Sequence, residues 1–207
     1  MVSELKLDLA CGALINKKEG YFGIDIIPHE GVDCVMDLQR YPWDIESNSA
    51  EEINCSHYVE HIKHDNVSAR IQDVVNKSAT FEEFKKNINT PEFTDNLDEF
   101  IKFMNEVYRI LKPGGKLTIT CPFYTSVRAF GDPTHTRYIG DWTFYYFNKE
   151  WRDLNGVGHL NLECDFDIRY SYGIENEMTL KSEEVRNKHF KYDWNVINDI
   201  YAVLIKR

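Results

Sequence analysis

The sequence predicts a single-domain α/β protein built around a doubly wound, seven-stranded mixed sheet. Five short apolar runs in the first 121 residues are typical of buried parallel strands, and two longer runs near the C-terminus indicate antiparallel strands closing one edge. Between them, apolar residues recur at helical spacing from about Leu97 to Leu111. The 207 residues suffice for one core, and we expect one domain over 1–207.

The strands follow from these apolar runs in order along the chain. We expect them at residues 4–9, 21–26, 32–37, 51–56, 116–121, 162–174 and 199–206. The helix near 97–111 should end at Lys112-Pro113-Gly114-Gly115, because proline stops a helix and the glycines make the turn into the next strand.

Two further helices are expected within residues 63–93, before the long helix. Thr80 and Glu83 stand at capping-box spacing at the start of the second one. The polar segment at about 63–95 is therefore predicted to be a helical insert, and we expect it to act as a lid or cover.

The connection between the first two strands is unusually short. Only seven residues separate Gly12 from Gly20, whereas a parallel crossover usually needs about a dozen or more. The first crossover should therefore be a loop or a single turn, which leaves that face of the sheet thinly covered.

Composition excludes several classes of protein. The net charge of −10 and the absence of a Lys/Arg-rich run argue against a nucleic-acid-binding surface. No apolar run approaches the ~20 residues that span a bilayer, and the N-terminus has no signal-peptide pattern. The five cysteines form no Cys-x-x-Cys pair, so we expect reduced thiols in a cytoplasmic protein.

Carboxylates close the first strands and point to a nucleoside ligand. Asp25 and Asp37 each follow a short apolar run, and ligands of open α/β sheets bind outside the carboxyl ends of the strands. Asp25 can accept hydrogen bonds from both ribose hydroxyls, and Asp37 can accept from an adenine amino group. Gly12 lets the backbone approach a ligand, and Asp8 would orient that loop or an ammonium group.

The phosphate-binding device of dinucleotide enzymes is missing. A G-x-G-x-x-G turn leading into a helix would hold a pyrophosphate, but Gly12 is followed by Ala-Leu-Ile-Asn-Lys. S-adenosylmethionine fits this difference, because it carries a ribose but no phosphate.

At this point the sequence resembles the class I S-adenosylmethionine-dependent methyltransferases, in particular the small methyltransferase type 11 group with its Rossmann-like fold. Four blocks match in order over residues 4–121, the insert excepted, and residues 122–207 match only loosely. They are Leu7-Asp8-Leu9-Ala10-Cys11-Gly12, Gly23-Ile24-Asp25-Ile26, Met36-Asp37-Leu38, and Cys55 to Ile62 with Asn105 to Leu117.

The resemblance implies a set of cofactor-binding residues. They are Asp8, Ala10, Cys11, Gly12, Asp25, Ile26, Asp37, Leu38, Ser56 and His57. The chain departs from the family at Ala10, which replaces the usual glycine, and at Leu14, where another glycine is common. The methyl group of Ala10 would lie close to the methionine moiety and could reduce affinity.

The acceptor site is expected in the segment at about 122–160, which should face the methyl group. His135 is the first candidate for a general base, and Asp132 could orient it. Arg137 could bind an anionic part of the substrate, and Tyr124 and Tyr145 could line the pocket. The alternative is a rigid Asp-Pro turn with a surface salt bridge and aromatic residues that belong to the core.

The sequence thus predicts a methyltransferase with S-adenosylmethionine as cofactor and a small-molecule acceptor, possibly sugar-linked. No His/Cys/Asp set has metal-ligand spacing, so no metal is expected. The first alternative is a non-catalytic cofactor-binding or scaffold protein, and the second is a nucleotide-sugar or NAD-linked enzyme. A nucleic-acid methyltransferase is less favoured, because the [DNS]-P-P-[YFW] tetrapeptide is absent after the fourth strand. The chain could be a monomer or a dimer.

Overall fold

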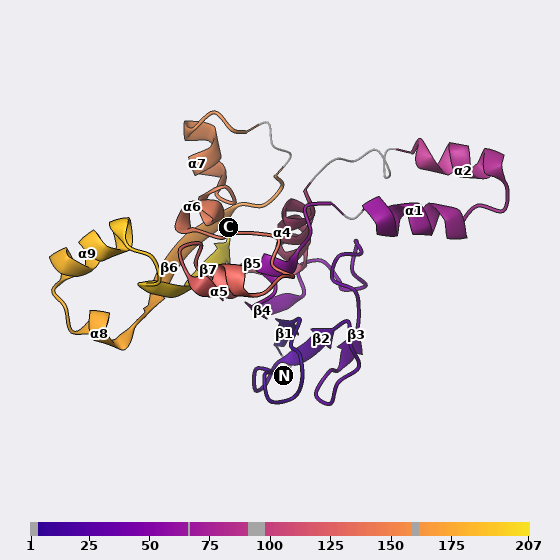
Figure 1. Ribbon diagram of the computed structural model, residues 1–207. Helices are drawn as coiled ribbons and strands as arrows, with labels where there is room; N and C mark the ends of the chain where they lie inside the picture. Colours follow the sequence, from indigo (N-terminus) through magenta and orange to yellow (C-terminus); the bar gives the residue numbers. More distant parts are fainter. Residues whose placement is uncertain (1–3, 66, 91–97, 159–161) are drawn as a thin grey trace.

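The computed structural model describes residues 4–65, 67–90, 98–158 and 162–207 (Figure 1). Seven strands form one sheet in the order β3-β2-β1-β4-β5-β7-β6. Their bounds are β1 Leu5–Leu9, β2 Phe22–Asp25, β3 Cys34–Val35, β4 Ala50–Ser56, β5 Leu111–Pro122, β6 Phe166–Ile174 and β7 Ile197–Lys206.

The strand directions confirm the predicted mixed sheet. Strands β1 to β5 pair in parallel, whereas β7 is antiparallel to both β5 and β6. All seven strands overlap the expected ranges, and β5 begins five residues earlier because Leu111 already pairs with Ala50, before an irregularity in the register that ends at Lys116. The carboxyl ends of β1 to β5 therefore share one edge with the start of β7.

Helix α4 (Glu99–Ile110) is the long helix that the apolar spacing predicts. The side chain of Asp98 accepts a 2.9 Å hydrogen bond from the amide of Phe100 and caps its start. Its buried face packs on the sheet through Phe103, Met104 and Val107, which are fully buried. This helix is the packed crossover between β4 and β5.

The first crossover is a loop, as predicted. Residues 10–21 contain no helix, only turns such as the one closed by the 2.8 Å bond from Asn16 N to the carbonyl of Ala13. Helices are also absent from the links β2–β3 and β3–β4, residues 26–33 and 36–49. Backbone hydrogen bonds of turns, together with side chains, hold these loops in place of helical hydrogen bonds.

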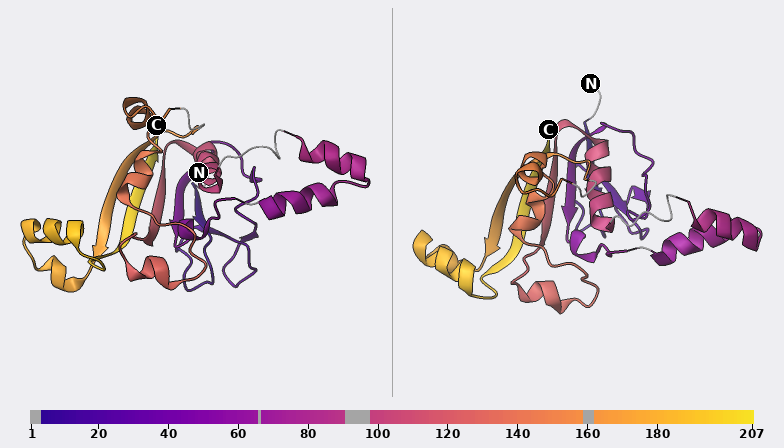
Figure 2. Two further views of the ribbon diagram at one scale, coloured as in Figure 1. Left: turned by 45° about the horizontal axis from the view of Figure 1, so that its top comes forward. Right: turned by 90° about the horizontal axis from the view of Figure 1, so that it is seen from above.

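The helical insert consists of α1 (Val67–Asn76) and α2 (Phe81–Ile88). The hydroxyl of Thr80 accepts from the amide of Glu83 at 3.2 Å, which confirms the predicted cap. No residue of α2 is buried, and both helices extend away from the sheet (Figures 1 and 2). The insert does not cover the sheet edge here, and its action as a lid stays a prediction.

The remaining helical segments lie in the links that follow β4, β5 and β6. They are the 3₁₀ turn η1 (Val59–His61) after β4, α5 (Val127–Gly131), α6 (Asp141–Tyr145) and α7 (Lys149–Leu154) between β5 and β6, and α8 (Asn176–Thr179) and α9 (Glu183–Tyr192) between β6 and β7. Helices α8 and α9 project on the side opposite α1 and α2 (Figure 2).

One continuous apolar cluster joins the sheet to α4 and to the segment after β5. All five cysteines are free thiols; Cys34 is half-buried and the other four are buried. In the described part of the chain, no helix combines the length and apolarity that crossing a bilayer requires.

Candidate functional site

The candidate site lies where the parallel strands end. Three connections meet at this edge: the β1–β2 loop (residues 10–21), the turn after β4 with η1, and the segment after β5 (residues 123–139). Because these loops come from neighbouring strands, they bring residues far apart in the sequence into one place.

Asp25, the last residue of β2, organises the first of these loops. Its Oδ2 accepts a hydrogen bond from the amide of Gly12 at 2.8 Å, and its Oδ1 accepts from the amide of Ile27 at 3.0 Å. Each carboxylate oxygen has two lone pairs, so both oxygens retain one acceptor site. The residue is 9% exposed, and its carboxylate keeps spare accepting capacity.

Asp8 holds the β1–β2 loop, which is one of the two roles expected for it; the other is to bind an ammonium group. Its Oδ2 accepts from the amide of Lys18 at 2.7 Å, and its Oδ1 accepts from the side chain of Asn54 at 2.6 Å. The carboxylate is buried beneath the loop. These bonds fix the position of the β1–β2 loop, which has no crossover helix to do so.

Asp37 lies beyond the short strand β3 and is half-exposed. Its Oδ1 accepts from the amide of Gln39 at 3.0 Å, and its Oδ2 accepts from Nε of Arg40 at 3.3 Å. Arg40 also pairs with Asp73 of α1 at 2.8 Å. The carboxylate is thus held in place at the same edge as Asp25.

The backbone around the site adopts the left-handed conformation at three positions. Gly12 has φ +64°, Ala10 has φ +55° and His57 has φ +52°. Glycine takes up this conformation without strain, whereas a residue with a Cβ does so at a cost. Ala10 therefore stands where a glycine would be unstrained, which agrees with the glycine of the family motif.

The other expected cofactor residues surround these groups in different ways. Cys11 is buried beside Asp8 and Asp25, and burial raises the pKa of its thiol, so it stays protonated. Ile26 is exposed after β2, and Ser56 is exposed at the end of β4. Leu38 packs in the core, and its carbonyl accepts from the indole N–H of Trp43 at 3.3 Å.

His57 points its ring toward a buried carboxylate. Its Nδ1 lies 3.3 Å from Oε1 of Glu60, and this hydrogen bond raises the pKa of His57. About half of the His57 side chain is exposed to solvent. It is thus a basic, accessible group just after the end of β4.

Arg137 is held by contacts with the protein itself. Its Nε donates to the carbonyl of Ile62 at 2.6 Å, one terminal nitrogen donates to the carbonyl of Lys63 at 2.7 Å, and the other pairs with Asp98 at 3.0 Å. All three nitrogens have partners and the side chain is buried. The guanidinium joins the segment after β5 to the segment after η1, so its placement does not support the expected role in binding an anionic part of the substrate.

His135 and Asp132 lie together in this segment, but not as a hydrogen-bonded pair. The Nδ1 of His135 is 3.1 Å from the carbonyl of Ala129, whereas its Nε2 is 4.0 Å from Oδ2 of Asp132. Asp132 instead caps Thr134, whose amide and hydroxyl both donate to Oδ1, and these bonds lower the pKa of Asp132. The carbonyl of Ala129 is therefore the group that orients His135.

The two candidate tyrosines are separated. Tyr124 is exposed at the site edge, where its ring lies 4.7 Å from that of Phe123. Tyr145 stacks on Trp151 and contacts Tyr170 of β6, the edge strand farthest from β3. Asp25 and Asp37 lie near the β2–β3 edge of the sheet, whereas Tyr145 lies near the opposite edge, at β6. The placement of Tyr145 therefore does not support the expected role in substrate binding.

Two groupings escape the sequence analysis. Beside the site, the exposed ring of Phe130 contacts the exposed rings of Tyr138 and Trp194, with centroid separations of 4.5 Å and 5.8 Å. Glu60, His61 and His135 each bring a ligand atom within 4.8 Å of the others. Both sets combine residues from distant parts of the chain, so no local sequence motif predicts them.

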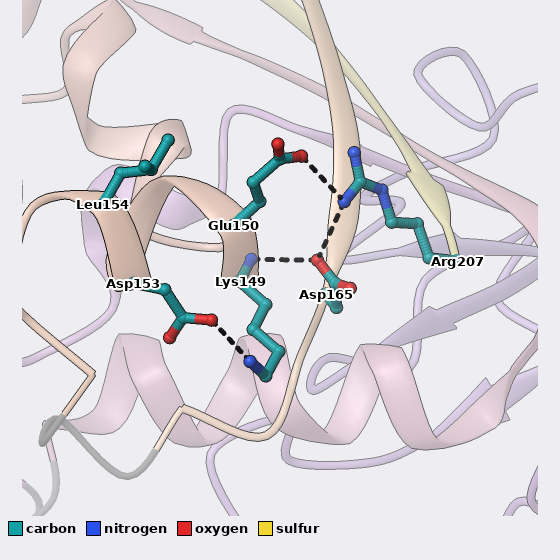
Figure 3. A pocket seen from close by; sticks show the side chains of 6 residues that line it. All are labelled: Lys149, Glu150, Asp153, Leu154, Asp165 and Arg207. Carbon is teal, nitrogen blue, oxygen red and sulfur yellow. Dashed lines mark hydrogen bonds and ion pairs between the residues drawn. The ribbon is translucent and has the colours of Figure 1, made fainter.

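A shallow depression of about 400 Å³ lies at the other end of the sheet (Figure 3). Its acids and bases pair with one another: Arg207 contacts Glu150 at 3.7 Å and Asp165 at 3.8 Å, and Lys149 contacts Asp153. It is remote from the strand ends that carry the expected residues, and both of its basic side chains are paired with its own acids.

Comparison with known proteins identifies the class of fold. A methyltransferase from Archaeoglobus fulgidus, described as S-adenosylmethionine-dependent, matches with 19% identity over 98% of this chain and 86% of that one, with a TM-score of 0.58. An S-adenosylmethionine-dependent methyltransferase from Mesorhizobium loti shares 12% identity over 98% and 90% of the two chains, with a TM-score of 0.46. No family model matches the sequence, and neither does any curated protein.

The fold is therefore that of the class I S-adenosylmethionine-dependent methyltransferases, a single-domain Rossmann-like α/β fold with a mixed seven-stranded sheet. The particular form in this chain has a loop as its first crossover and a helical insert before α4. At these identities the comparison establishes the fold, and the activity has to be argued from the site.

Proposed function

We propose that this protein is an S-adenosylmethionine-dependent methyltransferase that acts on a small-molecule acceptor. The observation that carries the proposal is the carboxylate of Asp25, held by the amides of Gly12 and Ile27 with an acceptor site left on each oxygen. This is the arrangement that a ribose diol requires, at the strand ends where this fold binds its ligand.

The residues present fit the cofactor. Asp25 would bind the ribose hydroxyls, Asp37 the adenine amino group, and the left-handed backbone at Ala10 and Gly12 the methionine portion. The β1–β2 loop offers no helix N-terminus, so a pyrophosphate would lack its usual binding site. This supports S-adenosylmethionine over NAD or a nucleotide sugar.

When bound, S-adenosylmethionine supplies a methyl group on a positively charged sulfur. The chain must align the acceptor, exclude water and remove a proton where the acceptor is a hydroxyl or amine. His57 is half-exposed just after the end of β4 and can take such a proton. His135, the base expected from the sequence, is the second candidate, and its Nε2 has no hydrogen bond to Asp132.

The surface beside the site supports a ring-shaped acceptor. Phe130, Tyr138 and Trp194 expose their rings together, and aromatic faces offer flat apolar area for a sugar or another ring. The net charge of −10 opposes binding of a nucleic acid. Free cysteines fit a reducing compartment, so a cytoplasmic location is part of the proposal.

Calorimetric titration tests the cofactor directly. We expect micromolar binding of S-adenosylmethionine and S-adenosylhomocysteine, and no binding of NAD. Release of S-adenosylhomocysteine in the presence of candidate acceptors then tests turnover. Binding without turnover on any acceptor would favour the non-catalytic alternative, and no binding of either sulfur compound would overturn the proposal.

A further inference from the structure

A cluster of three potential ligands lies next to the proposed acceptor site. Glu60 and His61 belong to η1 after β4, and His135 belongs to the segment after α5. Their ligand atoms lie within 4.8 Å of one another, and the rings of His61 and His135 meet edge to face with centroids 4.6 Å apart.

Hydrogen bonds leave the same nitrogen open on both histidines. The Nδ1 of His135 faces the carbonyl of Ala129 at 3.1 Å, and a carbonyl can only accept, so Nδ1 carries the proton. The Nδ1 of His61 lies 2.9 Å from the hydroxyl of Thr134, which itself donates to Asp132 at 2.7 Å. His61 must therefore also donate through Nδ1, and each Nε2 presents a lone pair.

Glu60 contributes an unsatisfied buried carboxylate. The residue is 1% exposed; Oε1 is bound by His57, whereas Oε2 is buried without a hydrogen-bond partner among the described residues. A buried carboxylate oxygen without a partner is costly, and native structures rarely leave one. A cation bound at this oxygen would remove that cost.

The backbone holds the three groups together. The carbonyl of Glu60 accepts from the amides of Thr136 at 2.8 Å and Arg137 at 3.2 Å, and the hydroxyl of Thr136 donates to the carbonyl of Ile62 at 2.8 Å. With the guanidinium of Arg137, these bonds fasten the His135 segment onto η1. The cluster is thus built before any ligand arrives.

We propose that Glu60, His61 and His135 bind one divalent transition-metal ion, contrary to the sequence expectation of no metal. Two imidazoles and one carboxylate suit Zn²⁺, Mn²⁺, Co²⁺ or Fe²⁺, whereas Mg²⁺ and Ca²⁺ prefer oxygen ligands. Ligand bonds of about 2.0–2.2 Å require the donors to move closer by about 1 Å, which side-chain rotation allows. The bonds from Ala129 and Thr134 are the outer interactions that orient metal-binding histidines.

The proposed ion also indicates which class of molecule accepts the methyl group. This inference rests on the proposed function. Three protein ligands leave positions open, and a metal-bound hydroxyl loses its proton more readily. The acceptor would therefore carry a hydroxyl group that reaches the ion, as a sugar or catechol does. His135 is then a ligand of the ion and no longer a candidate general base.

The test is metal binding by untagged, chelator-treated protein, followed by calorimetry with Zn²⁺, Mn²⁺ and Mg²⁺ and by the visible spectrum of Co²⁺. We expect one equivalent of Zn²⁺ or Co²⁺ and much weaker binding of Mg²⁺. Glu60→Gln and His135→Ala should each weaken binding by at least about 100-fold. His29→Ala, which removes an exposed histidine of the β2–β3 loop, is the matched control and should bind as the parent does.

Far-UV circular dichroism and S-adenosylmethionine affinity check that the variants fold. No binding, equal binding by all three variants, or a preference for Mg²⁺ would overturn the metal site. Cofactor binding by metal-free protein separates the two proposals. If the cofactor binds but metal does not, only the metal site fails, and if metal binds but the cofactor does not, only the proposed function fails.

Discussion

Replacing Asp25 by alanine tests the centre of the proposed cofactor site. The change removes the carboxylate that holds the amides of Gly12 and Ile27 and that would accept the ribose hydroxyls. Two effects should follow: a less stable β1–β2 loop and weaker binding of S-adenosylmethionine. The two effects can be measured separately.

The magnitudes follow from the hydrogen bonds. A hydrogen bond to a charged group contributes about 1.5–3 kcal/mol, so losing the ribose contact should weaken cofactor binding by about 10–100-fold. The two backbone bonds lie near the surface, where water replaces part of each, so we expect unfolding to become easier by about 2 kcal/mol.

Asp33→Ala is the matched control for this measurement. Oδ2 of Asp33 accepts from the amide of Gly23 at 2.6 Å and also binds Lys17, so its removal costs similar backbone support without touching the ribose position. Calorimetry gives the cofactor affinity and urea denaturation gives the stability. If Asp25→Ala binds S-adenosylmethionine as tightly as the parent, the assignment of Asp25 to the ribose is refuted.

Two further predictions concern the left-handed residues. Ala10→Gly should raise the free energy of unfolding by about 1 kcal/mol, because glycine adopts the φ of +55° without strain; an unchanged urea midpoint would contradict this. His57→Gln should flatten the pH dependence of stability. Because Glu60 raises the pKa of His57 above 6.5, its contribution is present below pH 6.5 and is lost as pH rises through the raised value. Urea midpoints compared at pH 6 and pH 8.5 in chelator check it, and equal pH dependence in parent and variant would refute it.

Much of the fold could be predicted from local patterns. The apolar runs gave the strands, and the spacing of Phe100, Met104 and Val107 gave α4, because buried strands and helices have different periods. The short gap between Gly12 and Gly20 likewise predicted a loop, since it has no room for a crossover helix. The direction of the insert could not be predicted, because no sequence pattern states what a polar helix pair packs against.

Only those residues of the candidate site that are placed by their own strands could be predicted from the sequence. Asp25 and Gly12 are fixed by the strands that precede them, and their contact follows from pairing of β1 with β2. A basic residue in a loop, such as Arg137, suggests an anionic ligand from sequence, whereas in the structure three partners in distant segments hold its guanidinium. The contact of His61 with His135 depends in the same way on tertiary hydrogen bonds between two loops.

The exposed helix pair α1–α2 has a consequence for ligand binding. Helices of 10 and 8 residues are too short to be stable alone, and α2 buries no residue against the sheet. Local unfolding of this helix pair should therefore require little free energy, compared with unfolding of the sheet. If a ligand bound the insert against the sheet edge, immobilising the helix pair would cost conformational entropy. The observed affinity would then be lower than the contacts alone would give, so closure of the insert would oppose tight binding.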